Sequence, residues 1–234
     1  MNKILLLGGS GKLGKYLVKE LNITPDTEYL APTHKECDIT NYKQLKNVIH
    51  EYQPNIIIHA AGFVDTQGCE NDKQKCLDIN VGGTYNIVKV CRKYHIKLVY
   101  ISSEYVFEGL DIPYTPQSPL NPINTYGISK ACGELMVKTL DNHLIIRAPF
   151  IRSPQFPHEY AFTDHFTNKQ YVNEISSDIL NLILNKSMGI IHIIGEYQSI
   201  YDLAKKTKDD VKPIQKNEDT KSIIPTYLNL TPNI

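Results

Sequence analysis

Tyr126 and Lys130 are spaced so that they could perform acid–base chemistry on a carbonyl group. Residues four apart share one face of a helix, and a nearby ammonium group favours the phenolate, which lowers a tyrosine pKa from its usual value of about 10. Ser103 follows a predicted strand, where its hydroxyl could donate to a carbonyl oxygen. We predict Ser103, Tyr126 and Lys130 as catalytic residues, with Tyr126 as the proton donor. Because Tyr-x-x-x-Lys spacing is common in helices, this prediction depends on the elements around it.

The segment Gly8-x-x-Gly11-x-x-Gly14 lies between a predicted strand and a predicted helix. Glycines in such a turn let a pyrophosphate approach the backbone, and the N-terminus of the following helix favours negative charge. In this context the pattern indicates a dinucleotide site rather than a glycine-rich turn without a ligand. A bound nicotinamide would supply the hydride for reduction of the carbonyl.

The end of the second predicted strand bears on which nicotinamide is used. An acidic residue there would bind the ribose diol of NAD, but this chain has His34 and Lys35, which could bind a 2′-phosphate. We therefore predict NADP as the cofactor, with NAD as the alternative. Asp38 and Ile39 are placed to reach the adenine, although Asp38 could instead stabilise a turn or cap a helix.

Strands and helices alternate through the first 147 residues, and this pattern predicts a doubly wound parallel α/β sheet, Rossmann-like, with its ligand crevice at the carboxyl ends of the strands. The predicted strands are residues 3–7, 28–31, 55–59, 97–102 and 143–147, and the predicted helices are residues 12–21, 42–52, 73–94 and 129–140.

Two domains are predicted. Residues 1–150 form the dinucleotide-binding domain, and residues 151–234 form a small C-terminal substrate lobe. The lobe is expected to contain a helix near 176–184, a strand at 189–194 and a short helix near 199–206. From residue 207 the polar sequence predicts no regular structure.

Bulk composition argues against several classes of protein. The 234 residues include 25 Lys plus Arg and 25 Asp plus Glu, so there is no basic excess for a nucleic-acid partner. No leader-like or bilayer-spanning apolar run is evident, and we expect a cytoplasmic protein without a membrane partner. The five cysteines form no C-x-x-C pair and the histidines show no ligand spacing, so no metal is expected. A homodimer is expected only from the habit of such folds.

Residues 100–109, 118–122 and 126–134 closely resemble the dTDP-4-dehydrorhamnose reductase family of extended short-chain dehydrogenases/reductases. Ser-Ser-Glu-Tyr-Val-Phe, at residues 102–107, is the most specific match. The resemblance implies NADPH-dependent reduction of the 4-keto group of a nucleotide-linked 4-keto-6-deoxyhexose. The nucleotide, dTDP or UDP, and the exact sugar stay open, because the segment after Arg147 is shorter than in the family.

The same resemblance implies roles for individual residues. Ser103 would hold the keto oxygen, Tyr126 would donate the proton, and Lys130 would bind the nicotinamide ribose. Tyr105 would contact the substrate, as would Glu104, where the family has Asp, and Phe150, where it often has Trp. The remaining implied cofactor contacts are Lys12 and Leu13 at the pyrophosphate and Ala60, Ala61 and Gly62 at a strand end.

A second function is open because the β subunit of methionine adenosyltransferase resembles this family around the same Ser-Ser-x-Tyr-Val-Phe element. The short C-terminal lobe motivates this alternative, a non-catalytic, NADP-binding regulatory subunit. The aligned acid–base pair favours the enzyme, since a scaffold does not need one.

Overall fold

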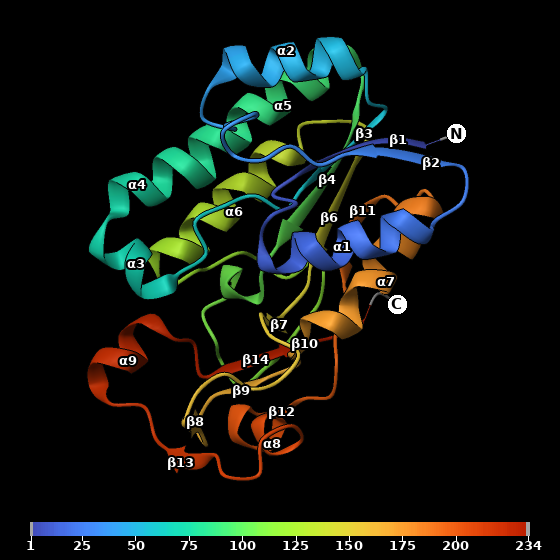
Figure 1. Ribbon diagram of the computed structural model, residues 1–234. Coiled ribbons are helices and arrows are strands. Elements are labelled where there is room, and N and C mark those ends of the chain that lie inside the picture. The colour runs from blue at the N-terminus through green and yellow to red at the C-terminus, as the bar shows by residue number, and fades with distance from the viewer. Residues whose placement is uncertain (1, 233–234) are drawn as a thin grey trace.

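A six-stranded parallel sheet forms the centre of the computed structural model, which describes residues 2–232 and, of residues 221–222, only the backbone (Figure 1). The strand order is β11-β6-β4-β3-β1-β2. The strands are β1 Asn2–Leu7, β2 Thr27–Leu30, β3 Ile56–His59, β4 Lys97–Ser102, β6 His143–Arg147 and β11 Gly189–His192. The doubly wound α/β prediction is confirmed. The order reverses between β1 and β3, and such a switch point is where α/β sheets bind ligands.

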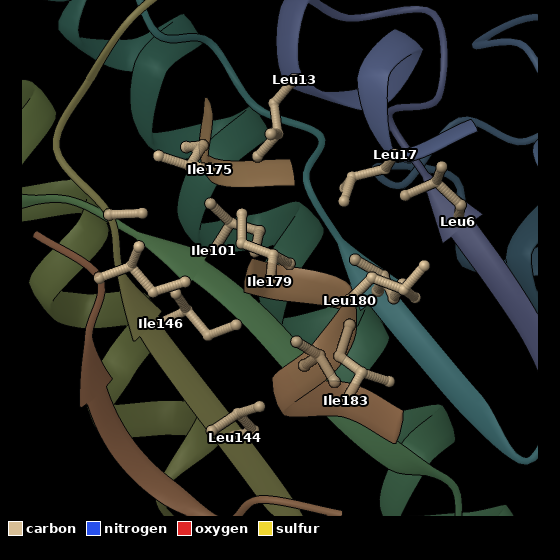
Figure 2. Packing of buried hydrophobic residues seen from close by; sticks show 14 of the residues in the cluster. Leu6, Leu13, Leu17, Ile101, Leu144, Ile146, Ile175, Ile179, Leu180 and Ile183 are labelled. Carbon is tan, nitrogen blue, oxygen red and sulfur yellow. The ribbon is translucent and has the colours of Figure 1, made fainter. Parts of the chain in front are cut away.

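Alternate residues of each strand enter two different cores, because successive side chains point to opposite faces of a sheet. Ile4 and Leu6 of β1 contribute to one core with α1 (Lys12–Ile23) and α7 (Val172–Leu184). Figure 2 shows how side chains of α7 and α1 pack over the strands on this face. On the other face, Leu5 and Leu7 pack with α2 (Tyr42–Tyr52), α5 (Gly83–Tyr94) and α6 (Thr125–Val137).

The helix predicted over residues 73–94 is interrupted. It consists of α4 (Lys73–Leu77), a π-helical turn η1 (Asp78–Gly82) and α5, and α3 (Thr66–Asn71) precedes it without having been predicted. The π turn contains the buried Asn80, whose side chain bonds to the loop after β3. A π turn inside a helix often marks a functional site.

The helix that carries Tyr126 begins earlier than predicted. α6 starts at Thr125 rather than residue 129, because the Asn124 side chain accepts a hydrogen bond from the Gly127 N–H at 2.6 Å. This N-cap satisfies a backbone donor that would otherwise lack a partner. Tyr126 and Lys130 consequently lie in the first two turns of one helix, as their proposed chemistry requires.

The domain division at residue 150 stays a prediction, and two elements after that residue pack with the large sheet. β11 and α7 come from the segment assigned to the lobe, yet β11 extends the large sheet and α7 covers it. The lobe is built from short elements below the sheet (Figure 1). They are η2 Glu104–Val106, β5 Pro113–Tyr114, β7 Phe150–Ile151, β8 Tyr160–Phe162, β9 Phe166–Thr167, β10 Gln170–Tyr171, β12 Gln198–Ser199 and α8 Ile200–Lys205.

Regular structure also occurs after residue 207, where none was predicted. β13 (Lys212–Ile214), α9 (Glu218–Ile223) and β14 (Tyr227–Leu230) follow one another. β14 pairs with both β9 and β5 in a four-stranded sheet of order β12-β9-β14-β5. Its stability comes from partners distant in sequence, which local periodicity does not reveal. Across residues 2–232, no helix has the length and apolar character needed to cross a bilayer.

Candidate active site

The glycine-rich turn after β1 brings three backbone segments into close contact. Gly8 has φ +93°, and a Cβ on it would lie 2.6 Å from the carbonyl carbon of Ala60. A Cβ on Gly14 would lie 2.1 Å from the Gly8 carbonyl oxygen. Only glycine fits both positions, and the ends of β1, β3 and α1 meet there as a result.

The N-terminus of α1 suits a bound pyrophosphate. Its N-cap, Gly11, offers no side chain to the helix, and no acidic residue lies in the first turn, which begins with Lys12 and Leu13. The first backbone N–H groups of a helix have no partner within the helix, and its dipole favours an anion. The chain therefore fits the dinucleotide predicted from its glycines.

The loop after β2 places the residues predicted to surround the adenosine. The side chain of His34 is 79% exposed and its Nε2 lies 3.7 Å from Asp38 Oδ1, while Lys35 is also exposed. Asp38 Oδ1 accepts hydrogen bonds from the Thr40 N–H at 2.9 Å and from its hydroxyl at 2.8 Å. Asp38 thus fills the turn role that the sequence left open, and its contact with adenine stays a prediction.

A hollow of about 870 Å³ opens beside this loop, lined by residues that include His34, Asp38, Ile79 and Gly82. Ile39 of the same loop is buried, so close to α5 that a Cβ on Gly83 would lie 2.6 Å from the Ile39 Cδ1. The hollow therefore joins the 33–40 loop to the α4–η1–α5 segment.

Ala60, Ala61 and Gly62 form the loop after β3, and Asn80 fixes the next residue. Its Oδ1 accepts from the Phe63 N–H at 2.7 Å, and its Nδ2 donates to the Phe63 carbonyl and to Ser129 Oγ, each at 2.9 Å. Ser129 in turn donates to the Tyr126 carbonyl at 2.7 Å. Asn80 thereby connects the loop to the helix that carries Tyr126. The sequence reasoning did not select Asn80.

Ser103 and Tyr126 are brought together as predicted. Ser103 follows β4, and its hydroxyl lies close enough to the Tyr126 phenol to influence the pKa of that phenol. Burial raises the pKa of Tyr126 above its usual value, and the Ser103 hydroxyl and the charge of Arg152 oppose the rise. Tyr126 is consequently protonated at neutral pH, which suits a proton donor.

The Lys130 ammonium lies over the ring of Tyr100, 4.0 Å from its centroid. Burial lowers the pKa of Lys130 to about 7, and the negative charge of Glu134 opposes the fall. The sequence argument expected Lys130 to lower the pKa of Tyr126. In the structure burial dominates at Tyr126 instead, and the proposed effect of Lys130 on it stays a prediction.

Glu104 is buried and both its oxygens are engaged. Lys169 Nζ lies 2.5 Å from Oε1, and the Thr167 hydroxyl donates to Oε2 at 2.5 Å. The Lys169 ammonium also lies 5.1 Å from the Tyr105 ring centroid. The substrate contact expected of Glu104 stays a prediction, while the observed role of its carboxylate is to hold Lys169 beside Tyr105.

Tyr105 lies next to Tyr126, the predicted proton donor, with the two ring centroids 6.1 Å apart in an edge-to-face arrangement. Phe150, in β7, packs partly against the core formed with α1 and α7. Sequence reasoning missed Lys169 and Arg152 as neighbours of these tyrosines. The segment with Lys169 resembles the family only faintly, and Arg152 belongs to no motif.

Among the residues that the structure describes, no group of three or more His, Cys, Asp or Glu side chains could hold a metal ion.

Comparisons with known proteins agree with this geometry. The dTDP-4-dehydrorhamnose reductase of Aggregatibacter actinomycetemcomitans is 31% identical over 227 residues, which cover 87% of this chain and 77% of that protein. The methionine adenosyltransferase 2 subunit beta of Rattus norvegicus is 29% identical over 182 residues, which cover 74% of this chain. The chain spans about half the length of some curated relatives that it matches, 54% for this subunit and for the spore coat polysaccharide biosynthesis protein SpsK of Bacillus subtilis.

Among solved structures, dTDP-4-dehydrorhamnose reductase from Bacillus anthracis, in complex with NADP, has a TM-score of 0.89 and 27% identity, covering 100% of this chain and 91% of that one. The model of the family described as the RmlD substrate binding domain matches residues 1–170. The chain belongs to this family.

Proposed function

We propose that this protein is an NADPH-dependent reductase of the 4-keto group of a nucleotide-linked 4-keto-6-deoxyhexose. The observation that carries the proposal is that Ser103 lies close enough to Tyr126 for its hydroxyl to lower the pKa of the phenol, with Lys130 one turn further along the helix of Tyr126. Similarity to two proteins named as dTDP-linked sugar reductases supports the substrate class. The nucleotide and exact sugar are left to experiment.

Each residue has one task in the proposed reaction. NADPH, when bound, supplies the hydride. Ser103 donates a hydrogen bond to the keto oxygen, Tyr126 gives its phenolic proton to that oxygen, and the Lys130 ammonium stabilises the phenolate left behind. Tyr105 and Phe150 would bind the sugar.

NADPH is proposed over NADH because His34 and Lys35 are exposed in the loop after β2, where an acidic residue would instead bind the ribose diol of NAD. The NADP in the Bacillus anthracis structure supports this choice. Replacing Lys35 with Ala should weaken NADPH binding while leaving NADH binding nearly unchanged, as measured by fluorescence titration. Equal effects on both would contradict the proposed 2′-phosphate contact.

The proposed activity is tested by following NADPH oxidation with 4-keto-6-deoxy intermediates made in situ from dTDP-glucose, UDP-glucose and UDP-N-acetylglucosamine. Turnover with any of them supports the reductase and identifies its nucleotide and sugar. Tyr126→Phe should bind NADPH nearly as well as the parent chain but lose most of the turnover.

A regulatory subunit is the second candidate, favoured by the similarity to the methionine adenosyltransferase β subunit over 74% of this chain. This candidate predicts cofactor binding without turnover of any of the three intermediates, and a stable complex with an unlike chain on pull-down from its source. The expected homodimer and cytoplasmic location stay predictions. Light scattering coupled to size-exclusion chromatography tests the first, and cell fractionation tests the second.

A further inference from the structure

Glu134 lies on α6, one helical turn after Lys130 and two after Tyr126, and its side chain is fully buried. Its Oε1 accepts hydrogen bonds from Ser102 Oγ at 2.6 Å and from Arg147 Nε at 2.9 Å. Its Oε2 accepts from Arg147 Nη2 at 2.7 Å. One carboxylate therefore joins the catalytic helix to the last residue of β4 and the last residue of β6.

The network extends through Arg147 to the C-terminal part of the chain. Arg147 Nη1 donates to the Pro116 carbonyl at 3.2 Å and lies 3.1 Å from His192 Nε2. His192 Nδ1 lies 2.9 Å from the Thr231 carbonyl oxygen. Since the guanidinium has only donors, His192 accepts through Nε2 and donates from Nδ1. Burial and Arg147 keep this histidine neutral by lowering its pKa to about 4.

Stability alone is a weak reason for such a pair. Replacing both partners of a buried ion pair by apolar residues is often neutral or stabilising, because burying the charges costs about as much as their attraction returns. The location of the Glu134–Arg147 pair, next to the predicted catalytic residues, indicates a role in the reaction instead. Ser102 precedes Ser103 in the chain, and Glu134 is on the helix that presents Tyr126 and Lys130.

The groups around Lys130 also indicate that Glu134 acts on the predicted catalytic residues. Tyr100 of β4 presents its ring to the ammonium, His59 of β3 is neutral, and the Cys76 thiol comes from α4. Tyr126 on the same helix is protonated, and Arg147 of β6 is already paired. Against the cost of burial, the Glu134 carboxylate is the largest influence that favours the charged form of Lys130.

We propose that Glu134 is a positioning residue for the reduction, which holds Ser103 and the catalytic helix in one arrangement and places a negative charge one helical turn from Lys130. The catalytic part of this role rests on the proposed function, because it matters only if the protein is a reductase. The effect on Lys130 is a property of the folded chain and is measurable without substrate.

The substrate-free test is an NMR titration of the Lys130 side chain in protein with ¹³C-labelled lysine, assigned by the signal missing from Lys130→Arg. In Glu134→Gln the midpoint for Lys130 should fall by about one pH unit, because the negative charge one helical turn away on α6 is lost. Glu134→Asp keeps the charge and should restore most of the shift. Glu196→Gln, at an exposed pair with Lys206, is the matched control and should leave the midpoint unchanged.

The kinetic test compares pH profiles of NADPH oxidation. A midpoint that falls from about 7 to about 6 reduces the charged fraction of Lys130 at pH 7.5 about eightfold. In Glu134→Gln, kcat should fall by about this factor and recover in part on acidification, while the NADPH Kd changes little. A uniform loss at every pH with an unmoved Lys130 midpoint would overturn the proposal.

Glu134→Gln leaves the Arg147 charge buried without its partner and could prevent folding. Glu134→Gln combined with Arg147→Met removes both charges and is expected to fold. Its Lys130 midpoint should still lie below that of the parent chain. A midpoint equal to the parent value overturns the proposal, whether or not the parent turns over a sugar nucleotide. If the parent is inactive while Glu134→Gln shifts the midpoint, the proposed function fails and the effect on Lys130 stands.

Discussion

Lys169→Met should destabilise the fold far more than Lys212→Met, although both substitutions remove a lysine from a short ion pair. Lys169 Nζ lies 2.5 Å from Glu104 Oε1, with side chains 13% and 1% exposed. Lys212 Nζ lies 2.7 Å from Glu159 Oε1, with side chains 58% and 60% exposed. The two pairs differ in burial rather than in distance.

The expected magnitude follows from what each substitution leaves behind. Without Lys169, the buried Glu104 carboxylate keeps its hydrogen bond from the Thr167 hydroxyl but has lost the positive charge that faced it. Removing one member of a buried pair typically costs about 3–5 kcal/mol. Because Thr167 still donates to Glu104, and methionine keeps most of the apolar contact, we expect about 3 kcal/mol. Water replaces Lys212 at Glu159, so no measurable loss is expected there.

Urea unfolding followed by far-ultraviolet circular dichroism gives both free energies of unfolding, since the chain contains no tryptophan to report by fluorescence. Equal losses in the two variants, or a loss below about 1 kcal/mol in Lys169→Met, would refute the argument from burial. A loss near 3 kcal/mol in Lys169→Met alone would support it.

Three further predictions concern the turn, the cap and pH. Gly14→Ala should weaken NADPH binding at least about tenfold, because the alanine Cβ would lie 2.1 Å from the Gly8 carbonyl oxygen. An unchanged NADPH Kd in a fluorescence titration would refute the proposed role of the turn. Asn124→Ala should lower the free energy of unfolding by about 1–2 kcal/mol through loss of the α6 cap, whereas Asn124→Asp should retain most of it in the same urea titration. The free energy of unfolding should fall as pH drops from about 6.5 toward 4, because burial lowers the pKa of His59 to about 3 and of His192 to about 4. The unfolded chain then binds more protons than the folded chain. A melting temperature that does not change with pH in calorimetry would contradict this prediction.

The sheet and its glycine turn were predictable because their determinants are local. Continuous apolar runs such as residues 56–58 indicate strands buried on both faces, and Gly8 and Gly14 occupy positions where no side chain fits. The start of α6 was missed although Asn124, three residues before Gly127, is a typical N-cap. A closer reading of that spacing would have placed Tyr126 in the helix from the sequence alone.

Other features depend on contacts between distant segments. Lys169 pairs with Glu104, which lies 65 residues earlier in the chain, and β14 pairs with β5 and β9, which are also distant in sequence. The π turn at Asn80 forms where its amide meets the loop after β3. The low pKa of Lys130 likewise results from burial by several elements together. Local periodicity contains none of this information.

The central claim, that Tyr126 donates the proton in a ketoreduction, is tested most directly by NADPH oxidation with dTDP-4-keto-6-deoxy sugar in the parent chain and in Tyr126→Phe. The account predicts turnover by the parent chain and loss of at least about a hundredfold in the variant, with NADPH affinity nearly unchanged. Equal turnover by the two proteins would contradict it. NADPH binding without turnover of this intermediate or of its UDP-linked counterparts would contradict the proposed reductase and favour the regulatory subunit.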